Sequence, residues 1–463
     1  MHKLFWILTA TVFTALLLPA LVQEGMFLDG VSYACIARNM ANGLGDFAHP
    51  YYTATLYPVC YEQPPLALWI QSQFFSVFGD HFWVERLYAL SLAVATAWGI
   101  VLNWELLTAQ PVDLQSAQKN LSWIPILLWI VAPIVFWGYQ NNMLECTMSF
   151  FVLISAFCAA RSEIEKRPAL LLPAALFAVA AVLSKGPVGF FPVAVPIAWS
   201  IAYDRNGIFG ASVRTFVLLA LTLALLGLFI FMVPGMSEYL DYYLNKQLLP
   251  TLSGVREKQV ENPFSFLSDL ISQVALPVIL IAGLWVKRGF QSVHWPKSAL
   301  FFLIVGLAGT LPLVFTPKQS AHYLIPSIPF YALGFAAMLS HNLRWNPAFL
   351  NQYRGWLEKI AWLVLGATLL ISLSFWGRSL RDESKIRDTK VLCKQVGKHT
   401  IIGIPQHFSN DWLLIAYLSR FGNVSLDSRA PHDFWLMEKG GTLPEGFEKL
   451  ETEMAAYELC KRL

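Results

Sequence analysis

Two carboxylates in residues 23–81 lie in settings that suit chemistry. Asp29 precedes a run with helical spacing, and Glu62 lies in Tyr-Glu-Gln-Pro-Pro. A carboxylate held beside a hydroxyl can act as a general base. A plainer interpretation stays open for each: Asp29 as the N-cap of a helix, and Glu62 as an acid favouring the N-terminus of a helix that prolines begin. One residue can fill both roles.

Two lysines occupy turns between apolar segments. Lys185 lies in Leu-Ser-Lys-Gly-Pro-Val-Gly, and Lys318 lies in Thr-Pro-Lys-Gln-Ser-Ala-His-Tyr. A fixed cation stabilises negative charge that develops on a leaving group, so each lysine is a candidate anion ligand. A lysine at the end of a membrane span can also extend its charge to the interface, and this alternative stays open for both.

The elements that must position these residues are membrane spans. The chain has 463 residues, of which 56% are hydrophobic and 14% are charged, whereas soluble domains are about 25% charged. Apolar runs of about 20 residues match a bilayer. The first run has no small-x-small cleavage site, so we interpret it as a retained span. We predict a mainly α polytopic protein with about eleven spans: 4–22, 82–107, 121–138, 144–160, 168–184, 187–203, 212–233, 267–286, 298–316, 322–340 and 358–377.

The distribution of charge predicts the orientation of these spans. Lys and Arg gather in every second loop, which places the N-terminus inside, and acids gather in the other loops. Asp29, Glu62 and Glu145 are therefore expected on the outer face. Lys185 and Lys318 share that face against the trend for lysine, which favours a functional role. The net charge of +3 is too small to suggest a nucleic-acid partner.

Three predicted outer segments are long or polar. Residues 23–81 contain two amphipathic stretches, which we expect to lie as helices along the membrane interface. Residues 234–266 are polar and form a candidate lid. After residue 377 the composition becomes that of a soluble domain, with a strand-like and a helix-like run. The expected organisation is a transmembrane catalytic domain over 1–377 and a small outer α/β domain over 378–463.

Several motifs occur in the order seen in one enzyme family. Together they resemble the protein O-mannosyltransferase and aminoarabinose-transferase superfamily, which are membrane glycosyltransferases with the GT-C fold. The resemblance covers residues 1–340. The motifs are Asp29 with Tyr33-Ala34 and Arg38, Glu62-Gln-Pro-Pro65, Phe78-Gly79 with Glu85-Arg86-Leu87, and the segments 142–150, 183–189 and 316–326.

The resemblance implies a reaction. Such enzymes move a sugar, a hexose or a pentose, from a polyprenyl-phosphate carrier such as undecaprenyl phosphate to an acceptor at the periplasmic face, with inversion. The acceptor is a lipid such as lipid A, a glycan or a protein. Asp29 matches the proposed catalytic base, and Glu62 matches the acid beside it. The usual lysine after that acid is Gln63 here, so contact with the carrier phosphate falls to other cations.

The remaining site residues divide by expected role. Phosphate contact needs cations or hydrogen-bond donors on the outer face, and the acceptor needs polar groups nearby. The candidates for binding the donor phosphate are Lys185, Lys318, Arg86 and Tyr323, and the candidates for acceptor or supporting roles are Tyr33, Arg38, Glu145 and His322.

Two further features stay open. Oxygen ligands suit divalent ions such as Mg, Mn or Ca, so Glu62, Glu145 and Glu261, with Asp29, are candidate ligands of a metal ion, although spacing does not show that they meet. An oxidising compartment would also permit two disulfides. The cysteine pairs that share an outer segment are Cys35 with Cys60 and Cys393 with Cys460.

A transporter or flippase for a lipid-linked substrate is the alternative from another class. It predicts ionisable residues or broken helices near the middle of the membrane, and often internal repeats. The candidate charges instead lie at the outer ends of spans, and no repeat is evident. A third alternative, a membrane scaffold with an outer binding domain, leaves the ordered motifs unexplained. The expected location is a bacterial inner membrane, with the active site and C-terminal domain in the periplasm.

Overall fold

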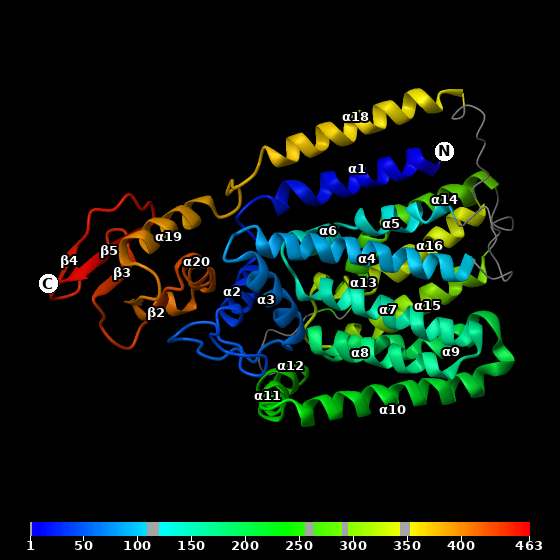
Figure 1. The fold of residues 1–463 in the computed structure, drawn as a ribbon, viewed down its shortest axis with the longest axis horizontal. Helices are drawn as coiled ribbons and strands as arrows, with labels where there is room; N and C mark the ends of the chain where they lie inside the picture. The colour runs from blue at the N-terminus through cyan, green and yellow to red at the C-terminus, as the bar shows by residue number, and fades with distance from the viewer. Residues whose placement is uncertain (1, 109–119, 255–261, 263, 289–294, 343–351) are drawn as a thin grey trace. The chain divides into compact units, whose positions relative to one another are not determined.

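The computed structural model describes residues 2–108, 120–254, 262, 264–288, 295–342 and 352–463. Its internal contacts divide the chain into two compact units (Figure 1). Unit 1 comprises residues 1–20 and 89–374, and unit 2 comprises residues 21–88 and 375–463. The first outer segment therefore folds with the C-terminal tail, although almost 300 residues of sequence lie between them. The functional division expected at residue 377 stays a prediction.

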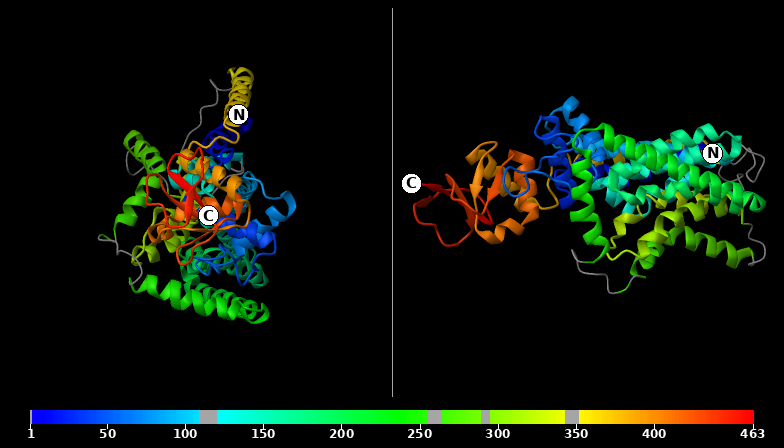
Figure 2. Two further views of the ribbon diagram at one scale, coloured as in Figure 1. Left: turned by 90° about the vertical axis from the view of Figure 1, so that its left-hand side faces the viewer. Right: turned by 90° about the horizontal axis from the view of Figure 1, so that it is seen from below.

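Unit 1 is a bundle of apolar helices. Helix α7 packs along α8, and α15 packs along α16, while the long α10 lies against α8 and α9 (Figures 1 and 2). Its elements, with α4 beginning in unit 2, are α1 (His2–Leu21), α4 (Val84–Thr108), α5 (Trp123–Ile130), α6 (Pro133–Gln140), α7 (Leu144–Glu165), η2 (Pro168–Leu170), α8 (Leu171–Lys185), η3 (Pro187–Ala194), α9 (Val195–Tyr203), η4 (Arg205–Gly207), α10 (Ile208–Met232), α11 (Met236–Tyr242), the π-helical η5 (Tyr243–Leu248), α12 (Leu249–Leu252), α13 (Ser265–Gln273), α14 (Ala275–Arg288), α15 (Lys297–Val314), η7 (Ala321–Leu324), α16 (Ile328–Asn342) and α18 (Arg354–Leu373).

Not every predicted span is one straight α-helix. Among the described residues, seven helices are long and apolar enough to cross a membrane, and two bent pairs raise the number to nine. The pairs α5–α6 and α13–α14 bend by 75° and 69°. The predicted runs at 187–203 and 322–340 begin with 3₁₀ turns, so α9 and α16 keep only 9 and 15 residues of α-helix. Apolar composition alone cannot distinguish such interrupted segments from straight spans.

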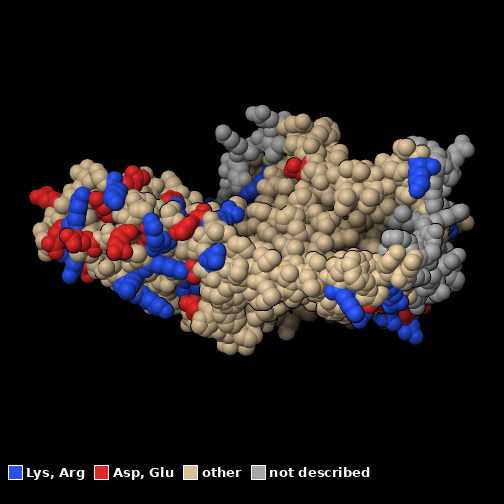
Figure 3. All heavy atoms as spheres, turned by 90° about the horizontal axis from the view of Figure 1, so that it is seen from above, with Lys and Arg blue, Asp and Glu red and all other residues tan. Residues whose placement is uncertain are grey.

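Two helices of unit 1 expose apolar surface that requires lipid. Only 11% of the apolar window is buried in α10 and in α18. Phe231 on α10 is 88% exposed, and Leu370 on α18 is 73% exposed. On the face drawn in Figure 3 the helices of unit 1 present a broad surface almost without charged side chains. Because such a surface is unfavourable in water, the chain is an integral membrane protein.

The candidate lid is more helical than a polar loop. Its described part forms three consecutive helices, α11, η5 and α12, which begin after Gly235. Met236 and Tyr239, spaced by three residues, are buried and anchor the first turn of α11. Residues 255–261 and 263 lie outside the described residues. The role of this segment as a lid stays a prediction.

Unit 2 combines two helices from the first outer segment with a small α/β domain. The sheet order is β2-β1-β3-β5-β4, in which β1 pairs in parallel with β2 and β3, while β5 is antiparallel to β3 and β4. The expected α/β tail is confirmed. The elements are α2 (Leu28–Ala41), α3 (Leu66–Phe78), α19 (Glu383–Val396), β1 (Ile401–Gly403), η8 (Gln406–Asn410), α20 (Trp412–Gly422), β2 (Ser425–Asp427), β3 (Phe434–Glu438), β4 (Phe447–Lys449) and β5 (Tyr457–Arg462).

Helix α2 holds unit 2 together because α3 and α20 both pack against it. Every residue from Tyr33 to Asn39 is buried on it, so burial does not follow the helical spacing that predicted an amphipathic helix. The N-cap interpretation of Asp29 is wrong. Phe27 occupies the N-cap, and Asp29 lies one residue inside the first turn. An acid there still interacts favourably with the helix dipole.

Neither expected disulfide is present. All six cysteines lie within the described residues, and all are free thiols. The Cys35 thiol donates a hydrogen bond to the Ala416 carbonyl at 3.3 Å. Cys393 faces α20 beside Gly422, whereas Cys460 packs with Met437 and Phe447 in the sheet. Helix and strand packing thus directs each thiol toward a different partner.

Candidate functional site

Three predicted site residues of unit 1 meet at the ends of its helices. Glu145 lies in the first turn of α7, directly after a turn in which Asn142 adopts a left-handed backbone with φ 53°. Asparagine tolerates this conformation better than most residues. The turn ends α6 and starts α7 within three residues, which places the Glu145 carboxylate inside the bundle with 0% exposure.

Lys185 is the last residue of α8. Gly186 ends the helix with φ 105°, and η3 then folds back along α8. A Cβ on Gly189 would lie 2.5 Å from the backbone nitrogen of Val182, so this close return requires glycine. The Ser-Lys-Gly-Pro-Val-Gly motif therefore builds a tight turn that holds the lysine at the helix end.

His322 completes the cluster from the 3₁₀ turn η7. The Glu145 Oε1 lies 3.2 Å from Lys185 Nζ and 3.7 Å from His322 Nε2. Lys185 and His322 are 11% and 18% exposed. The Trp137 ring is stacked on His322 with centroids 6.1 Å apart, which fixes the imidazole on its other side. We call Glu145, Lys185 and His322 the carboxylate–cation cluster.

The Glu145 carboxylate is incompletely satisfied. Neither of its oxygens accepts a hydrogen bond with good geometry from any described residue, although Lys185 is within ion-pair distance. Burying a carboxylate costs several kcal/mol unless charge and hydrogen bonds compensate fully. An incompletely compensated charge that persists in a buried position is typical of a site that binds something else.

The two remaining candidates of unit 1 lie in the same turn region as His322. Lys318 is half-buried between α15 and η7, and its carbonyl accepts a hydrogen bond from the Thr316 hydroxyl at 3.0 Å. The Gln319 side chain donates to the Val314 carbonyl at 2.8 Å and so ties the turn to the end of α15. Tyr323 packs edge-on against His322 with ring centroids 4.7 Å apart.

Unit 2 carries the predicted carboxylates Asp29 and Glu62. Asp29 is half-buried at the start of α2, while Glu62 is exposed in the segment before α3. Burial, with a smaller contribution from Glu62, raises the pKa of the Tyr57 hydroxyl and raises that of the Cys60 thiol to about 12. The negative charge of Glu62 therefore disfavours ionisation of the Tyr57 hydroxyl and of the Cys60 thiol. Tyr33 is buried on α2.

Arg38 and Arg86 hold backbone in unit 2. Arg86 donates from Nη2 to the carbonyls of Glu24 and Gly25 at 3.2 and 2.7 Å. Arg38 donates to the Ser419 carbonyl at 2.8 Å and to Asp80 at 3.3 Å. These contacts give both arginines a structural role. The phosphate contact expected of Arg86 and the acceptor role of Arg38 stay predictions.

A second charged cluster surrounds Arg420. Its guanidinium donates twice to Glu85, at 3.0 Å each, and once to Asp80 at 2.5 Å. Burial disfavours the charged guanidinium, but Glu85 and Asp80 outweigh it and raise the pKa of Arg420. We call Arg38, Asp80, Glu85 and Arg420 the arginine network.

The three glutamates predicted as metal ligands lie in different parts of the chain. Glu62 belongs to unit 2 and Glu145 to unit 1, while Glu261 lies outside the described residues. Within the part of the chain that the structure describes, no three His, Cys, Asp or Glu side chains form a group that could hold a metal ion.

Sequence reasoning missed two kinds of residue. Trp137 stacks on His322 and lies five residues before the motif that begins at Asn142. Its position next to that motif could have identified it as a candidate site residue. Arg420 carries no such signal. Its partner Glu85 lies 335 residues earlier, and nothing in the local sequence of either residue indicates the pairing.

Comparison with known proteins supports the fold. No protein-family model and no curated protein matched the sequence. Two crystal structures of ArnT from Cupriavidus metallidurans are similar along almost the whole chain. The form bound to undecaprenyl phosphate has a TM-score of 0.66, 16% identity, and coverage of 99% of this chain and 97% of ArnT. The apo form has a TM-score of 0.61, 15% identity, and coverage of 97% and 95%. The chain therefore has the same polytopic membrane fold as these two ArnT structures.

Proposed function

We propose that this protein is a glycosyltransferase that moves a sugar from a polyprenyl-phosphate carrier to an acceptor at the outer face of a membrane. One observation carries the proposal: in a GT-C fold, a buried and incompletely satisfied carboxylate gathers Lys185 and His322 at the ends of apolar helices. That arrangement offers a lysine cation and an imidazole to a lipid-borne anion.

The cations suit the leaving group. When the bond between the anomeric carbon and the phosphate oxygen breaks, negative charge develops on the phosphate. Preorganised cations stabilise that charge and commonly contribute the largest catalytic effect. In this proposal Lys185, Lys318 and His322 contact the phosphate, and Tyr323 donates a hydrogen bond to it. The structure of ArnT with undecaprenyl phosphate supports a donor of this class.

The carboxylates of unit 2 suit the acceptor. In the proposed reaction Asp29 accepts the proton of the acceptor hydroxyl, whose oxygen attacks the anomeric carbon opposite the phosphate. The sugar is transferred with inversion, and the proton remains on Asp29 until it is lost to water. Glu62 orients the acceptor, with Tyr33 in support.

The proposed location is a bacterial inner membrane with the active site on the periplasmic side. Lys and Arg concentrate in the loops assigned to the inside, which supports this orientation. The acceptor is a lipid, a glycan or a protein, and the transferred sugar is a hexose or a pentose.

The test compares Asp29→Asn with Asp46→Asn. Both variants make the same substitution in the first outer segment, and Asp46 is an exposed residue that accepts hydrogen bonds from the backbone of Ala48 and His49. Purified protein is incubated with labelled polyprenyl-phosphate sugars and candidate acceptors, and products are identified by mass spectrometry. Loss of a general base should lower transfer by about 10²–10⁴-fold in Asp29→Asn, with Asp46→Asn near wild type.

Two outcomes would count against the proposal. Full activity of Asp29→Asn would remove this residue from the mechanism. Wild-type protein that transfers no sugar from any polyprenyl-phosphate donor, yet moves the intact donor across a vesicle membrane, would favour the transporter alternative.

A further inference from the structure

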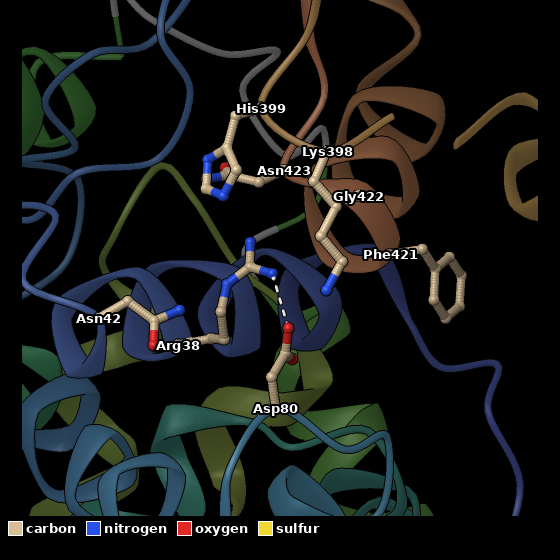
Figure 4. Close-up of a pocket in the computed structure, with 8 residues that line it drawn as sticks. All are labelled: Arg38, Asn42, Asp80, Lys398, His399, Phe421, Gly422 and Asn423. Carbon is tan, nitrogen blue, oxygen red and sulfur yellow. Dashed lines mark hydrogen bonds and ion pairs between the residues drawn. The ribbon is translucent and has the colours of Figure 1, made fainter. Parts of the chain in front are cut away.

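A small pocket in unit 2 contains none of the residues that the proposed reaction uses in its chemical step, although it includes Arg38, an acceptor candidate. It lies where the end of α2, the turn at Asp80, the segment before β1 and the end of α20 meet (Figure 4). Its volume is about 70 Å³, and a water molecule occupies about 30 Å³ in the liquid. The pocket therefore holds about two waters or one tetrahedral oxoanion. The lining residues are Arg38, Asn42, Asp80, Lys398, His399, Phe421, Gly422 and Asn423.

Cations and hydrogen-bond donors dominate the polar lining. Arg38 is 4% exposed and forms part of the floor. Lys398 is exposed, extends over the pocket in Figure 4, and forms no ion pair with any described residue. The Asn423 amide nitrogen lies 2.9 Å from His399 Nδ1. In the tautomer that accepts this amide's hydrogen bond at Nδ1, Nε2 carries the proton and can donate to a ligand.

The one acid in the lining does not oppose an anion. Asp80 is already paired with Arg38 at 3.3 Å and with Arg420 at 2.5 Å. Burial raises the pKa of Asp80, but Arg420 and Arg38 outweigh it and hold the pKa below 3.8. Glu85 is in turn engaged twice by Arg420. Three cations, including Lys398, therefore face two carboxylates, and one positive charge remains for a ligand.

Two residues of the lining hold unusual backbone conformations. His399 has φ 60° and Asn423 has φ 50°, both in the left-handed region. Asparagine adopts this region readily, but a histidine there costs about 1–3 kcal/mol unless its surroundings compensate. The conformation brings the His399 ring to Asn423 across the mouth of the pocket (Figure 4). Strain of this kind concentrates at binding sites.

We propose that this pocket binds a phosphate-sized oxoanion. Lys398 supplies the charge, His399 Nε2 and the Asn42 amide supply hydrogen bonds, and Arg38 supplies a positive floor. A phosphate monoester and free inorganic phosphate share this chemistry, and the pocket admits either because it is open to solvent beside Lys398. The inference does not depend on the proposed transfer reaction, because none of its four ligand residues takes part in the chemical step.

The experiment measures binding by calorimetry with full-length protein in a neutral detergent at constant ionic strength. The probes are inorganic phosphate and glucose 1-phosphate. The wild type should bind at least one of them saturably. Lys398→Ala should weaken binding by about 10–100-fold, the range for losing a hydrogen bond to a charged group. Lys394→Ala, at an exposed lysine on α19 outside the pocket, should bind as the wild type does.

A second variant separates binding from folding. His399→Gly removes the donor but relieves the left-handed backbone, so the protein should be as stable as the wild type or more stable and still bind less tightly. Equal binding of both probes would indicate free phosphate as a sufficient ligand, and binding of glucose 1-phosphate alone would indicate a sugar-linked phosphate. Absence of saturable binding by the wild type, or wild-type affinity in Lys398→Ala, would overturn the proposal.

Discussion

The two buried charged clusters of this protein differ in how completely their charges are satisfied. In the arginine network of unit 2, Arg420 makes two hydrogen bonds to Glu85 and one to Asp80. In the carboxylate–cation cluster of unit 1, Glu145 has ion-pair contacts at 3.2 and 3.7 Å and accepts no well-formed hydrogen bond from a described residue.

This difference distinguishes a structural cluster from a binding site. A saturated network keeps its own donors and acceptors occupied, so Arg38 can offer the neighbouring pocket only its charge, and the network joins distant parts of the chain. In the unsaturated cluster the Glu145 oxygens still lack hydrogen-bond donors, which a ligand hydroxyl group or a water molecule can supply. Both clusters contain residues from the resemblance motifs, since Glu85 and Glu145 occur in them, so motif membership alone does not separate the two roles.

Breaking the arginine network should have the largest effect on stability. Arg420→Leu leaves the buried Glu85 without its main partner and removes one of the two arginines paired with the partly exposed Asp80, which should lower the free energy of unfolding by about 3–5 kcal/mol. Chemical denaturation in detergent measures this loss. Arg429→Leu, at a largely exposed arginine of the same unit, should change little. If Arg420→Leu lost as little stability as Arg429→Leu, the arginine network would not be structural.

Neutralising the carboxylate–cation cluster should affect activity instead. The double variant Lys185→Met with Glu145→Gln removes both charges together, so no buried charge is left alone. Transfer should fall by about 10²–10³-fold because the leaving phosphate loses a cation, while the unfolding transition stays near that of the wild type. The control is Lys359→Met at an exposed position on α18. A large loss of stability with normal transfer would show that this cluster is structural and not a binding site.

Lowering the pH should destabilise the protein through the arginine network, because Asp80 becomes protonated. Arg420 and Arg38 outweigh burial and lower the pKa of Asp80 below its ordinary 3.8. The Asp80 carboxylate therefore contributes fully to the free energy of unfolding above its ordinary pKa of 3.8. This contribution is lost as the pH falls through the lower pKa of the folded state. Asp80→Asn should be less stable than the wild type at neutral pH and should lose less stability between about pH 5 and pH 2. Parallel acid unfolding curves would contradict this assignment.

Much of the fold followed from local sequence. Each predicted apolar run coincides with helical structure, because lipid requires segments whose side chains are apolar and whose backbone is internally hydrogen-bonded. The strand-like run near residue 401 and the helix-like run near residue 412 are β1 and α20. Predictions that depended on contact geometry were less accurate: the N-cap at Asp29 and the two disulfides.

The sequence by itself determined that the chain crosses a membrane and that its tail is a soluble α/β segment. It also identified the charged and polar residues that are candidates for catalysis and binding. Only the tertiary structure decided which of these groups meet. Glu145, Lys185 and His322 come from three helix ends separated by up to 177 residues, and Glu85 finds Arg420 across 335. Periodicity reports which face of a segment is apolar, but the partner of a buried charge depends on packing between segments, which no local pattern encodes.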